Sequence, residues 1–309
     1  MAEYGVSTDD ATNHHELLKV GPDRFLLTSL PLVEVPDGTQ QECTIANTGQ
    51  ASTATHVSGA RIEEVDSAGN VHRWWEADVL GAAGPDNIRL EETTVRLCFE
   101  RPETGERYLS SLHPNALNVR GDQVLMSARH ADAIYAIDFW GTGKIVWKLG
   151  GTQRENVSLT VDGQQPNLPA RQHDIEVLPN GNITLFDNRT PFSFATGPAV
   201  SGPARFVEYR LDLAARRATM VRQQARPNGD SSGALGSARV QPGGGVVINW
   251  GSVPGPQFTE FDADGNVLLE VSFSNQLDPS SPRFSYRTIK EPLEAFDLAR
   301  LRATAGRSS

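Results

Sequence analysis

The chain has 309 residues, and its 38 Asp and Glu residues outnumber its 28 Lys and Arg residues, which gives a formal net charge of −10. This acidic balance argues against a nucleic-acid partner, because phosphate binding needs a basic face. The sequence has no run of about eighteen apolar residues, which excludes a transmembrane helix, so we expect no membrane partner. The 28 Gly and 19 Pro residues indicate many short segments joined by turns.

The N-terminal residues and the two cysteines indicate in which cellular compartment the protein is expected. Met1 to Tyr4 lack the basic and apolar regions of a signal peptide, so we expect a cytoplasmic protein, or a secreted or periplasmic one if its leader has been trimmed. Cys43 lies in a polar stretch and Cys98 in a strand-like run, too far apart in sequence for a structural zinc site. A disulfide between them stays open, but two unrelated thiols in a reduced compartment are the favoured interpretation.

An internal repeat organises the chain. His15, His113 and His173 each begin an apolar segment that reaches a turn residue eight positions later, and a second apolar run follows each turn. Gly236 begins a fourth copy with the same spacing, and it stands where the other three have histidine. The last three copies start 60 and 63 residues apart, whereas 98 residues separate the first copy from the second. A regular period of this kind is the sequence signature of a repeat architecture.

Each repeat is completed by a second pair of apolar segments. These pairs lie within residues 62–71, 134–147, 206–221 and 258–269. Most of them alternate apolar and polar residues around a turn that contains Asp and Gly, which predicts antiparallel hairpins. Four strands per repeat, repeated at least four times, describe a β-propeller.

We therefore predict a single all-β propeller domain over residues 1–309. Its clear blades would span residues 14–77, 112–150, 171–224 and 234–273. Residues 78–111 would be a large insertion or a degenerate blade, and the tail around residues 293–301 would form a short helix.

The histidines of the repeat are the first candidates for a functional site. The innermost strands of a propeller line a central channel, so His15, His113 and His173 should converge at one mouth of it. Convergent titratable groups in a concave pocket favour a shared site. Two alternatives stay open: each histidine could cap its own blade, and His14 could be the inward-facing residue in place of His15.

Arginines at the ends of the predicted second strands are candidates for binding an anion. Arg129 ends one such strand and Arg189 follows the corresponding strand of the next repeat. A guanidinium group matches tetrahedral oxyanions well, which favours an anionic small-molecule substrate. Each arginine could instead pair with a neighbouring aspartate, such as Asp132 or Asp187.

We expect no metal and no cofactor. Three histidines invite a metal site, but Asp174 beside His173 is the one carboxylate near them at recognisable spacing. The sequence also lacks a P-loop, a dinucleotide fingerprint and a Gly-x-Ser-x-Gly nucleophile motif.

At these motifs the sequence resembles the arylsulfotransferase (ASST-type) propellers. The matching stretches are Leu112–Asn115, Ser127–His130, Ile134–Asp138, Ile145–Gly151, Gln172–Asp174, Pro179–Asn182, Leu185–Asn188, Gly236–Val240 and Tyr286–Arg287. Their order and spacing agree over about residues 14–290. The resemblance implies a six-bladed propeller that moves a sulfuryl group from a phenolic ester to another phenol, with a histidine as the covalent carrier.

The resemblance also implies roles for individual residues. His113 and His173 match channel histidines, and Arg189 approximately matches the arginine that binds the sulfate. The position expected for the histidine nucleophile is occupied here by Gly236 and Ser237. His173 is then the nearest nucleophile or base, with His113 as its partner, while Arg189, Arg129, His15 and Asn115 would bind the substrate or anion.

Two functions from different classes follow. In the first, the protein is an arylsulfotransferase-like enzyme that acts on an aromatic or anionic small molecule in the channel. In the second, it is a propeller that binds a ligand or partner and has lost the covalent step. The sequence leaves the donor, the acceptor and the oligomeric state open.

Overall fold

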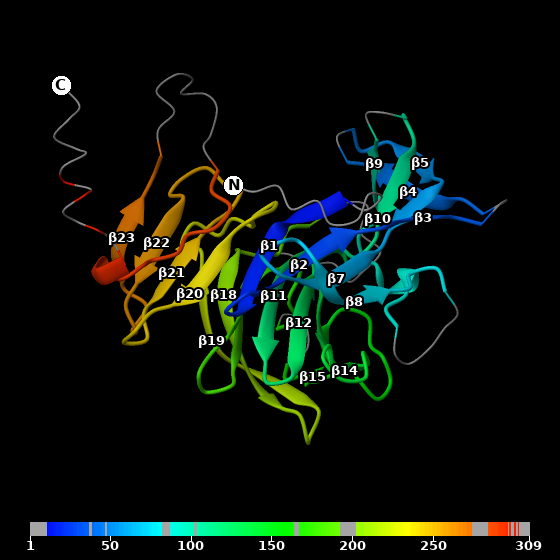
Figure 1. Ribbon diagram of the computed structural model, residues 1–309. Coiled ribbons are helices and arrows are strands. Elements are labelled where there is room, and N and C mark those ends of the chain that lie inside the picture. Colours follow the sequence, from blue (N-terminus) through cyan, green and yellow to red (C-terminus); the bar gives the residue numbers. More distant parts are fainter. Residues whose placement is uncertain are drawn as a thin grey trace.

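The structure is a computed structural model, and it describes residues 11–36, 39–46, 48–81, 87–101, 104–163, 167–191, 202–273, 284–295, 297, 300 and 302. Strands dominate this part of the chain, and its regular helical elements are three short 3-10 turns. Several antiparallel sheets follow one another along the sequence (Figure 1). The fold is therefore all-β and propeller-like. None of the described helical segments is long and apolar enough to cross a membrane.

The first repeat sheet has the strand order β1-β2-β7-β8. Its strands are β1 (Ala11–Gly21), β2 (Arg24–Leu30), β7 (Ala60–Val65) and β8 (Val71–Ala77). The turn between β7 and β8 is held by Asp66, whose Oδ1 accepts hydrogen bonds from the backbone N–H groups of Ala68 and Asn70. Gly69 occupies the left-handed position of that turn with φ of 85°, which a residue with a Cβ rarely adopts. The Asp-plus-Gly signal in the sequence thus marks a real hairpin.

Three further sheets repeat this arrangement with consecutive antiparallel strands. The second sheet contains β11 (Pro114–Arg120), β12 (Gln123–Ala128), β13 (Ala133–Ile137) and β14 (Ile145–Gly150). The third contains β16 (His173–Val177), β17 (Ile183–Asp187), β18 (Arg205–Asp212) and β19 (Arg217–Ala225), with β15 (Thr160–Val161) parallel to β19 at the outer edge. The fourth contains β20 (Ser237–Val240), β21 (Val246–Asn249), β22 (Phe258–Phe261) and β23 (Val267–Val271).

Successive side chains of a strand pack into the hydrophobic cores on opposite faces of its sheet, so the repeat sheets are stacked face to face. In β12, Val124 and Met126 belong to the core shared with the first sheet, whereas Leu125 belongs to the core shared with the third. In β17 the neighbours Leu185 and Phe186 divide in the same way between the second and fourth sheets. Because successive residues of a strand point to opposite faces, a strand buried on both faces reads as a continuous apolar run.

A six-stranded sheet is built from two separate insertions. Residues 32–58, between β2 and β7, supply β3 (Leu32–Glu34), β4 (Gln41–Ile45), β5 (Ala51–Ala54) and β6 (His56–Ser58). β9 (Leu97–Glu100) and β10 (Arg107–Ser110) come from the segment between the first and second repeat sheets. The strand order is β3-β6-β10-β9-β4-β5, with parallel pairings of β10 with β6 and of β4 with β9.

Cys43 and Cys98 form a disulfide inside this sheet. Cys43 lies in β4 and Cys98 in β9, and their Cα atoms are 5.6 Å apart. The expectation of two unrelated thiols was therefore wrong. The parallel pairing of β4 with β9 brings together cysteines that are 55 residues apart in the sequence. No local sequence pattern predicts that strand pairing.

The C-terminal segment at residues 284–290 returns to the repeat sheets. The N–H of Gly236 donates to the Tyr286 carbonyl oxygen at 3.0 Å, and the N–H of Thr288 donates to Ser237 Oγ at 3.0 Å. The trace runs beside β20 to β23 in Figure 1. Beyond it, a 3-10 turn spans Leu293–Ala295, and most of the tail predicted to be helical lies outside the described residues.

Candidate functional site

The innermost strand of each of the first three repeat sheets is irregular at its start. The pairing register shifts between Asn13 and Leu17 in β1, between Pro114 and Ala116 in β11, and between His173 and Glu176 in β16. Such bulges occur preferentially beside active sites, where they re-aim a side chain. The repeat histidines His15, His113 and His173 lie within or next to these three irregularities.

Backbone strain gathers in the same region. His113, Asp132, Arg171, Asp174, Arg189 and Leu235 all have φ between 51° and 64°, in the left-handed region. A residue with a side chain pays about 1–3 kcal/mol to stay there, and such residues cluster at ligand sites.

Asparagine side chains hold the inner strands in register. Asn13 Nδ2 donates to the Pro114 carbonyl oxygen at 2.7 Å, which ties β1 to β11. Asn115 Nδ2 donates to the Gln172 carbonyl oxygen at 2.7 Å, which ties the start of β11 to the residue before β16. Asn115 was predicted to bind the anion. In this structure its amide nitrogen joins the start of β11 to the residue before β16.

The structure brings four histidines together at this end of the strands. The ring centroids of His15 and His113 are 4.9 Å apart, and those of His113 and His130 are 4.6 Å apart. His173 lies close enough for its charge to lower the pKa of His113. His130 was not predicted as a site residue, although it directly follows Arg129 in the sequence. The side chain of His14 lies outside the described part of the chain.

His113 lies between His15 and His130 at the centre of this cluster, and its side chain is half-buried. Burial is the main cause that lowers its pKa well below the ordinary value, and the charges of His130 and Arg129 act in the same direction. The ring is therefore neutral at pH 7. Within the part of the chain that the structure describes, no hydrogen bond engages either ring nitrogen of His113, so its contacts are with the rings of His15 and His130.

His173 is buried and has both ring nitrogens in hydrogen bonds. Nδ1 lies 2.7 Å from Asn188 Oδ1, and Nε2 accepts the backbone N–H of Leu235 at 3.3 Å. Burial lowers the pKa of His173 to about 3, and the charge of Arg129 adds to the effect. The ring is neutral and held in one tautomer, with its proton on Nδ1.

Arg129 is the buried cation of the cluster. One guanidinium nitrogen donates to His130 Nε2 at 2.8 Å, and the other terminal nitrogen donates to the Gly233 carbonyl oxygen at 2.8 Å. His130 Nδ1 in turn donates to the Ser110 carbonyl oxygen at 2.9 Å. Burial lowers the pKa of Arg129 to about 10, so the group keeps its charge at pH 7.

Arg189 is tied to an aspartate, as one of the alternatives from the sequence anticipated. Its guanidinium lies 3.5 Å from the carboxylate of Asp187, which also binds Arg205 at 2.9 Å. The link between Arg189 and the histidines runs through the preceding residue, Asn188, whose side chain bonds His173.

Gly236 stands where the resemblance places a histidine nucleophile. It has φ of 104°, and a Cβ added there would come within 2.3 Å of the Phe186 ring and 3.1 Å of the Asn249 carbonyl oxygen. Backbone conformation and the aromatic neighbour both require glycine. The site therefore has no room for a side chain at this position.

Two residues of the C-terminal segment complete the cluster. The ring of Tyr286 lies 5.9 Å from that of His15. Arg287 pairs with Glu16 at 3.1 Å and with Asp174 at 3.1 Å, which connects the segment to β1 and β16. This Tyr-Arg pair is one of the stretches that match the family, but no role could be predicted for it because it lies outside the four repeats.

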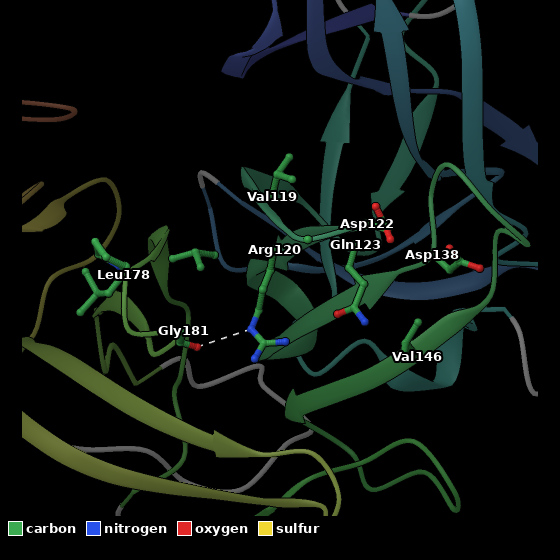
Figure 2. A pocket seen from close by; sticks show the side chains of 11 residues that line it. Val119, Arg120, Asp122, Gln123, Asp138, Val146, Leu178 and Gly181 are labelled. Carbon is green, nitrogen blue, oxygen red and sulfur yellow. Dashed lines mark hydrogen bonds between the residues drawn. The ribbon is translucent and has the colours of Figure 1, made fainter.

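A groove of about 660 Å³ lies at the opposite end of the inner strands. Arg120, at the end of β11, crosses it and donates to the Gly181 carbonyl oxygen at 3.4 Å, while Val119 and Leu178 line its wall (Figure 2). His113 and His173 lie at the starts of β11 and β16, and the far ends of these two strands line the groove, so the groove is separate from the histidine cluster. Among the described residues, no group of His, Cys, Asp and Glu side chains is arranged to hold a metal ion.

Comparisons with known proteins agree with the motifs. The family model Arylsulfotransferase (ASST) matches residues 31–287. Among solved structures, the chain is similar to a catalytically inactive virginiamycin B lyase from Staphylococcus aureus with quinupristin, at 10% identity over 82% of this chain and 76% of that one, with a TM-score of 0.32. No curated protein matches the chain. The family match covers most of the chain, including three of the four histidines in the cluster and both residues from the C-terminal segment. The chain belongs to the arylsulfotransferase (ASST) family.

Proposed function

We propose that the protein transfers a sulfuryl group from a phenolic sulfate ester to a phenol in the cluster of His15, His113, His130 and His173. Family membership supports sulfuryl transfer in general. The observation that carries the proposal is the state of His113, a neutral and half-buried imidazole beside a buried arginine. A nitrogen nucleophile must be unprotonated to attack sulfur, and a transition state with negative charge on the sulfuryl oxygens and the departing phenolate oxygen needs a nearby cation.

In the first half-reaction, a ring nitrogen of His113 attacks the sulfur of the aryl sulfate. A nitrogen–sulfur bond forms, the bond between sulfur and the aryl oxygen breaks, and the phenolate leaves with the electron pair. Arg129 stabilises the oxygens of the group being transferred, because its guanidinium keeps its charge in a buried setting where electrostatic interactions are strong.

In the second half-reaction, the phenol acceptor gives up its proton and its oxygen attacks the sulfur on His113. The nitrogen–sulfur bond breaks and returns the imidazole to its starting state. His15 is placed to take the acceptor proton, since its ring lies 4.9 Å from that of His113. Its Nδ1 is engaged by Asn13 Oδ1, so Nε2 is the nitrogen through which it would act.

In this scheme His173 is a structural residue that holds Asn188 and the backbone of Leu235 in place. The sequence made it the first choice for the nucleophile. Attack through Nε2 would require loss of the bond from the Leu235 N–H, and attack through Nδ1 would require loss of the bond to Asn188. We therefore assign the covalent step to His113 and a positioning role to His173.

A second candidate function rests on Gly236. The resemblance expects the nucleophile where this chain has Gly236 and Ser237. Position 236 has no room for a side chain and Ser237 is not a histidine, which favours a family member that binds an aromatic or anionic ligand without covalent transfer. Turnover separates the two functions, because a binding protein retains the ligand unchanged.

The disulfide bears on where the reaction takes place. Disulfides persist in oxidising compartments and are rare in the cytosol. We therefore propose a secreted or periplasmic protein in place of the cytoplasmic one expected from the N-terminus. Labelling of free thiols in protein taken directly from its native compartment tests this, since full labelling of Cys43 and Cys98 would contradict it.

The transfer assay uses 4-nitrophenyl sulfate as donor and 1-naphthol as acceptor. We expect release of 4-nitrophenol that depends on the acceptor, together with an equal amount of naphthyl sulfate detected by mass spectrometry. Release of 4-nitrophenol without naphthyl sulfate would indicate hydrolysis. Absence of both products, with the donor still bound, would favour the binding function.

A further inference from the structure

The Tyr286 hydroxyl is a buried polar group without a partner. Its oxygen is shielded from solvent, and no hydrogen-bond partner exists for it among the described residues. Buried hydroxyl groups in native proteins nearly always have a partner, because an unpaired one costs about 1–3 kcal/mol. An unpaired donor at a cluster of titratable groups therefore points to a ligand.

The surroundings of this hydroxyl are those of the histidine cluster. The Tyr286 ring contacts the His15 ring at 5.9 Å in an edge-on arrangement, and His15 contacts His113. The guanidinium of Arg129 is close enough to the Tyr286 hydroxyl for its positive charge to act on the pKa of that hydroxyl. Tyr286 thus faces the same group of side chains as the proposed nucleophile and the buried cation.

The C-terminal segment holds Tyr286 firmly in this place. On one side its backbone bonds Gly236, and Thr288 bonds Ser237 at the start of β20. On the other side Arg287 binds both oxygens of Glu16 in β1, each at 3.1 Å. A bidentate arginine contact fixes orientation as well as distance. The residue is therefore preorganised and needs no rearrangement to meet a ligand.

We propose that the Tyr286 hydroxyl donates a hydrogen bond to a sulfuryl oxygen of a bound aryl sulfate, between His15, His113 and Arg129. The identity of the ligand as a sulfate ester rests on the proposed function. The contact makes Tyr286 a substrate-binding residue that comes from outside the repeats. It also selects an oxyanion over a neutral ligand, because a hydroxyl bound to a charged acceptor contributes more than one bound to a neutral acceptor.

The hydroxyl acts as a donor and keeps its proton. Burial is the main cause that raises the pKa of Tyr286 above its ordinary value, although the positive charge of Arg287 opposes the change. At neutral pH the group is therefore protonated. Proton removal from the acceptor phenol stays with a histidine.

The test compares Tyr286→Phe with the native protein in the binding of inorganic sulfate by calorimetry and in the kinetics of 4-nitrophenyl sulfate. Phenylalanine keeps the ring against His15 and removes the donor alone. We expect sulfate affinity to fall about 10- to 100-fold, the range for losing a hydrogen bond to a charged group. The KM for 4-nitrophenyl sulfate should rise at least as much as kcat falls, because the sulfuryl charge is already present in the ground state.

Tyr108→Phe is the matched control. It removes a tyrosine hydroxyl from β10 in the six-stranded sheet, where Tyr108 stacks on Phe99. The control should bind sulfate as the native protein does. Equal thermal midpoints for Tyr286→Phe and the native protein would exclude a merely structural effect.

The outcomes separate this inference from the proposed function. Equal sulfate affinity in Tyr286→Phe and the native protein would overturn the inference, and so would a native protein that binds no sulfate. A native protein that binds sulfate but transfers no sulfuryl group would overturn the proposed function alone. The affinity ratio would still decide the role of Tyr286 in that case.

Discussion

His173 Nε2 accepts the backbone N–H of Leu235 at 3.3 Å, and this contact joins the third repeat sheet to the residue that precedes the fourth. Because Nε2 is the acceptor, Nδ1 carries the proton and donates it to Asn188 Oδ1 at 2.7 Å. Leu235 itself adopts φ of 64°, a conformation that needs support from its surroundings. His173 thus helps to position the backbone segments at Asn188 and Leu235 beside the cluster.

The first prediction separates the roles of the two central histidines. His113→Ala should abolish transfer from 4-nitrophenyl sulfate with little change in stability, because its ring makes no hydrogen bond to the described residues. His173→Ala should lower the free energy of unfolding by about 1–3 kcal/mol, since it leaves buried partners unsatisfied. Transfer that survives in His113→Ala and disappears in a folded His173→Ala would instead support the sequence-based hypothesis that His173 is the nucleophile.

The second prediction concerns pH and stability. The pKa of His173 is about 3, and those of His113 and His130 also lie well below the ordinary value of 6.5, with burial as the main cause in each. These rings stay neutral in the folded protein, whereas the unfolded chain takes up protons as the pH falls below about 6.5. Stability should therefore fall between pH 7 and pH 5, with each histidine contributing up to about 1.4 kcal/mol per pH unit.

Urea unfolding at pH 7, 6 and 5 measures this slope. His173→Gln should unfold with a smaller pH dependence than the native protein, because one of the titrating groups is gone. His56→Gln, in the six-stranded sheet, serves as the control and should keep the native slope. Identical slopes for the native protein and His173→Gln would contradict a neutral, buried His173.

The third prediction concerns Asp174, which anchors two arginines. Its carboxylate is buried, pairs with Arg239 and lies 3.1 Å from Arg287, and it accepts the backbone N–H of Ala238 at 2.9 Å. Asp174→Asn should destabilise the protein by about 1–3 kcal/mol, because it removes the buried negative charge that Arg239 and Arg287 share and leaves them only Glu176 and Glu16 as partners. Glu176→Gln, which removes a more exposed partner of Arg239, should cost less than about 1 kcal/mol in thermal unfolding. Equal losses of unfolding free energy in the two variants would contradict the role of Asp174 as the shared partner of Arg239 and Arg287.

The sequence predicted the repeat sheets because their signals are local. Alternating apolar residues and Asp-plus-Gly turns, such as the one at Asp66 and Gly69, need only neighbouring residues to form a hairpin. The six-stranded sheet could not be predicted in this way. It pairs residues 32–58 with residues 97–110, partly in parallel, and the intervening strands belong to another sheet.

The residues of the candidate site also divide into those that a local sequence pattern predicts and those that it does not. His15, His113 and His173 share one repeat position, so equal spacing was enough to group them. His130, Tyr286 and Arg287 reach the cluster from a 3-10 turn and from the C-terminal segment, which no period relates to the repeats. Gly236 shares this repeat position, but the sequence shows neither its φ of 104° nor the Phe186 ring beside it, and these two features explain why no histidine stands there.

The fourth prediction concerns the disulfide. Cys43 and Cys98 close a loop of 55 residues, and the loss of such a crosslink costs about 4 kcal/mol in the chain-entropy account. Reduction with dithiothreitol, or the double replacement Cys43→Ser with Cys98→Ser, should lower the thermal midpoint. Activity measured well below that midpoint should survive, because the crosslink lies in β4 and β9, outside the histidine cluster. An unchanged midpoint on reduction would contradict a disulfide in the native protein.

The most direct test of the central claim is the intact mass of the protein after brief incubation with 4-nitrophenyl sulfate and no acceptor. We predict one added SO3 group on the native protein and on His56→Ala, its loss when 1-naphthol is added, and no addition to His113→Ala. Tandem mass spectrometry under conditions that preserve the acid-labile nitrogen–sulfur bond should place the group on the peptide that contains His113. A folded native protein that binds the donor yet gains no mass, or an adduct on His113→Ala equal to that of the native protein, would contradict covalent transfer through His113.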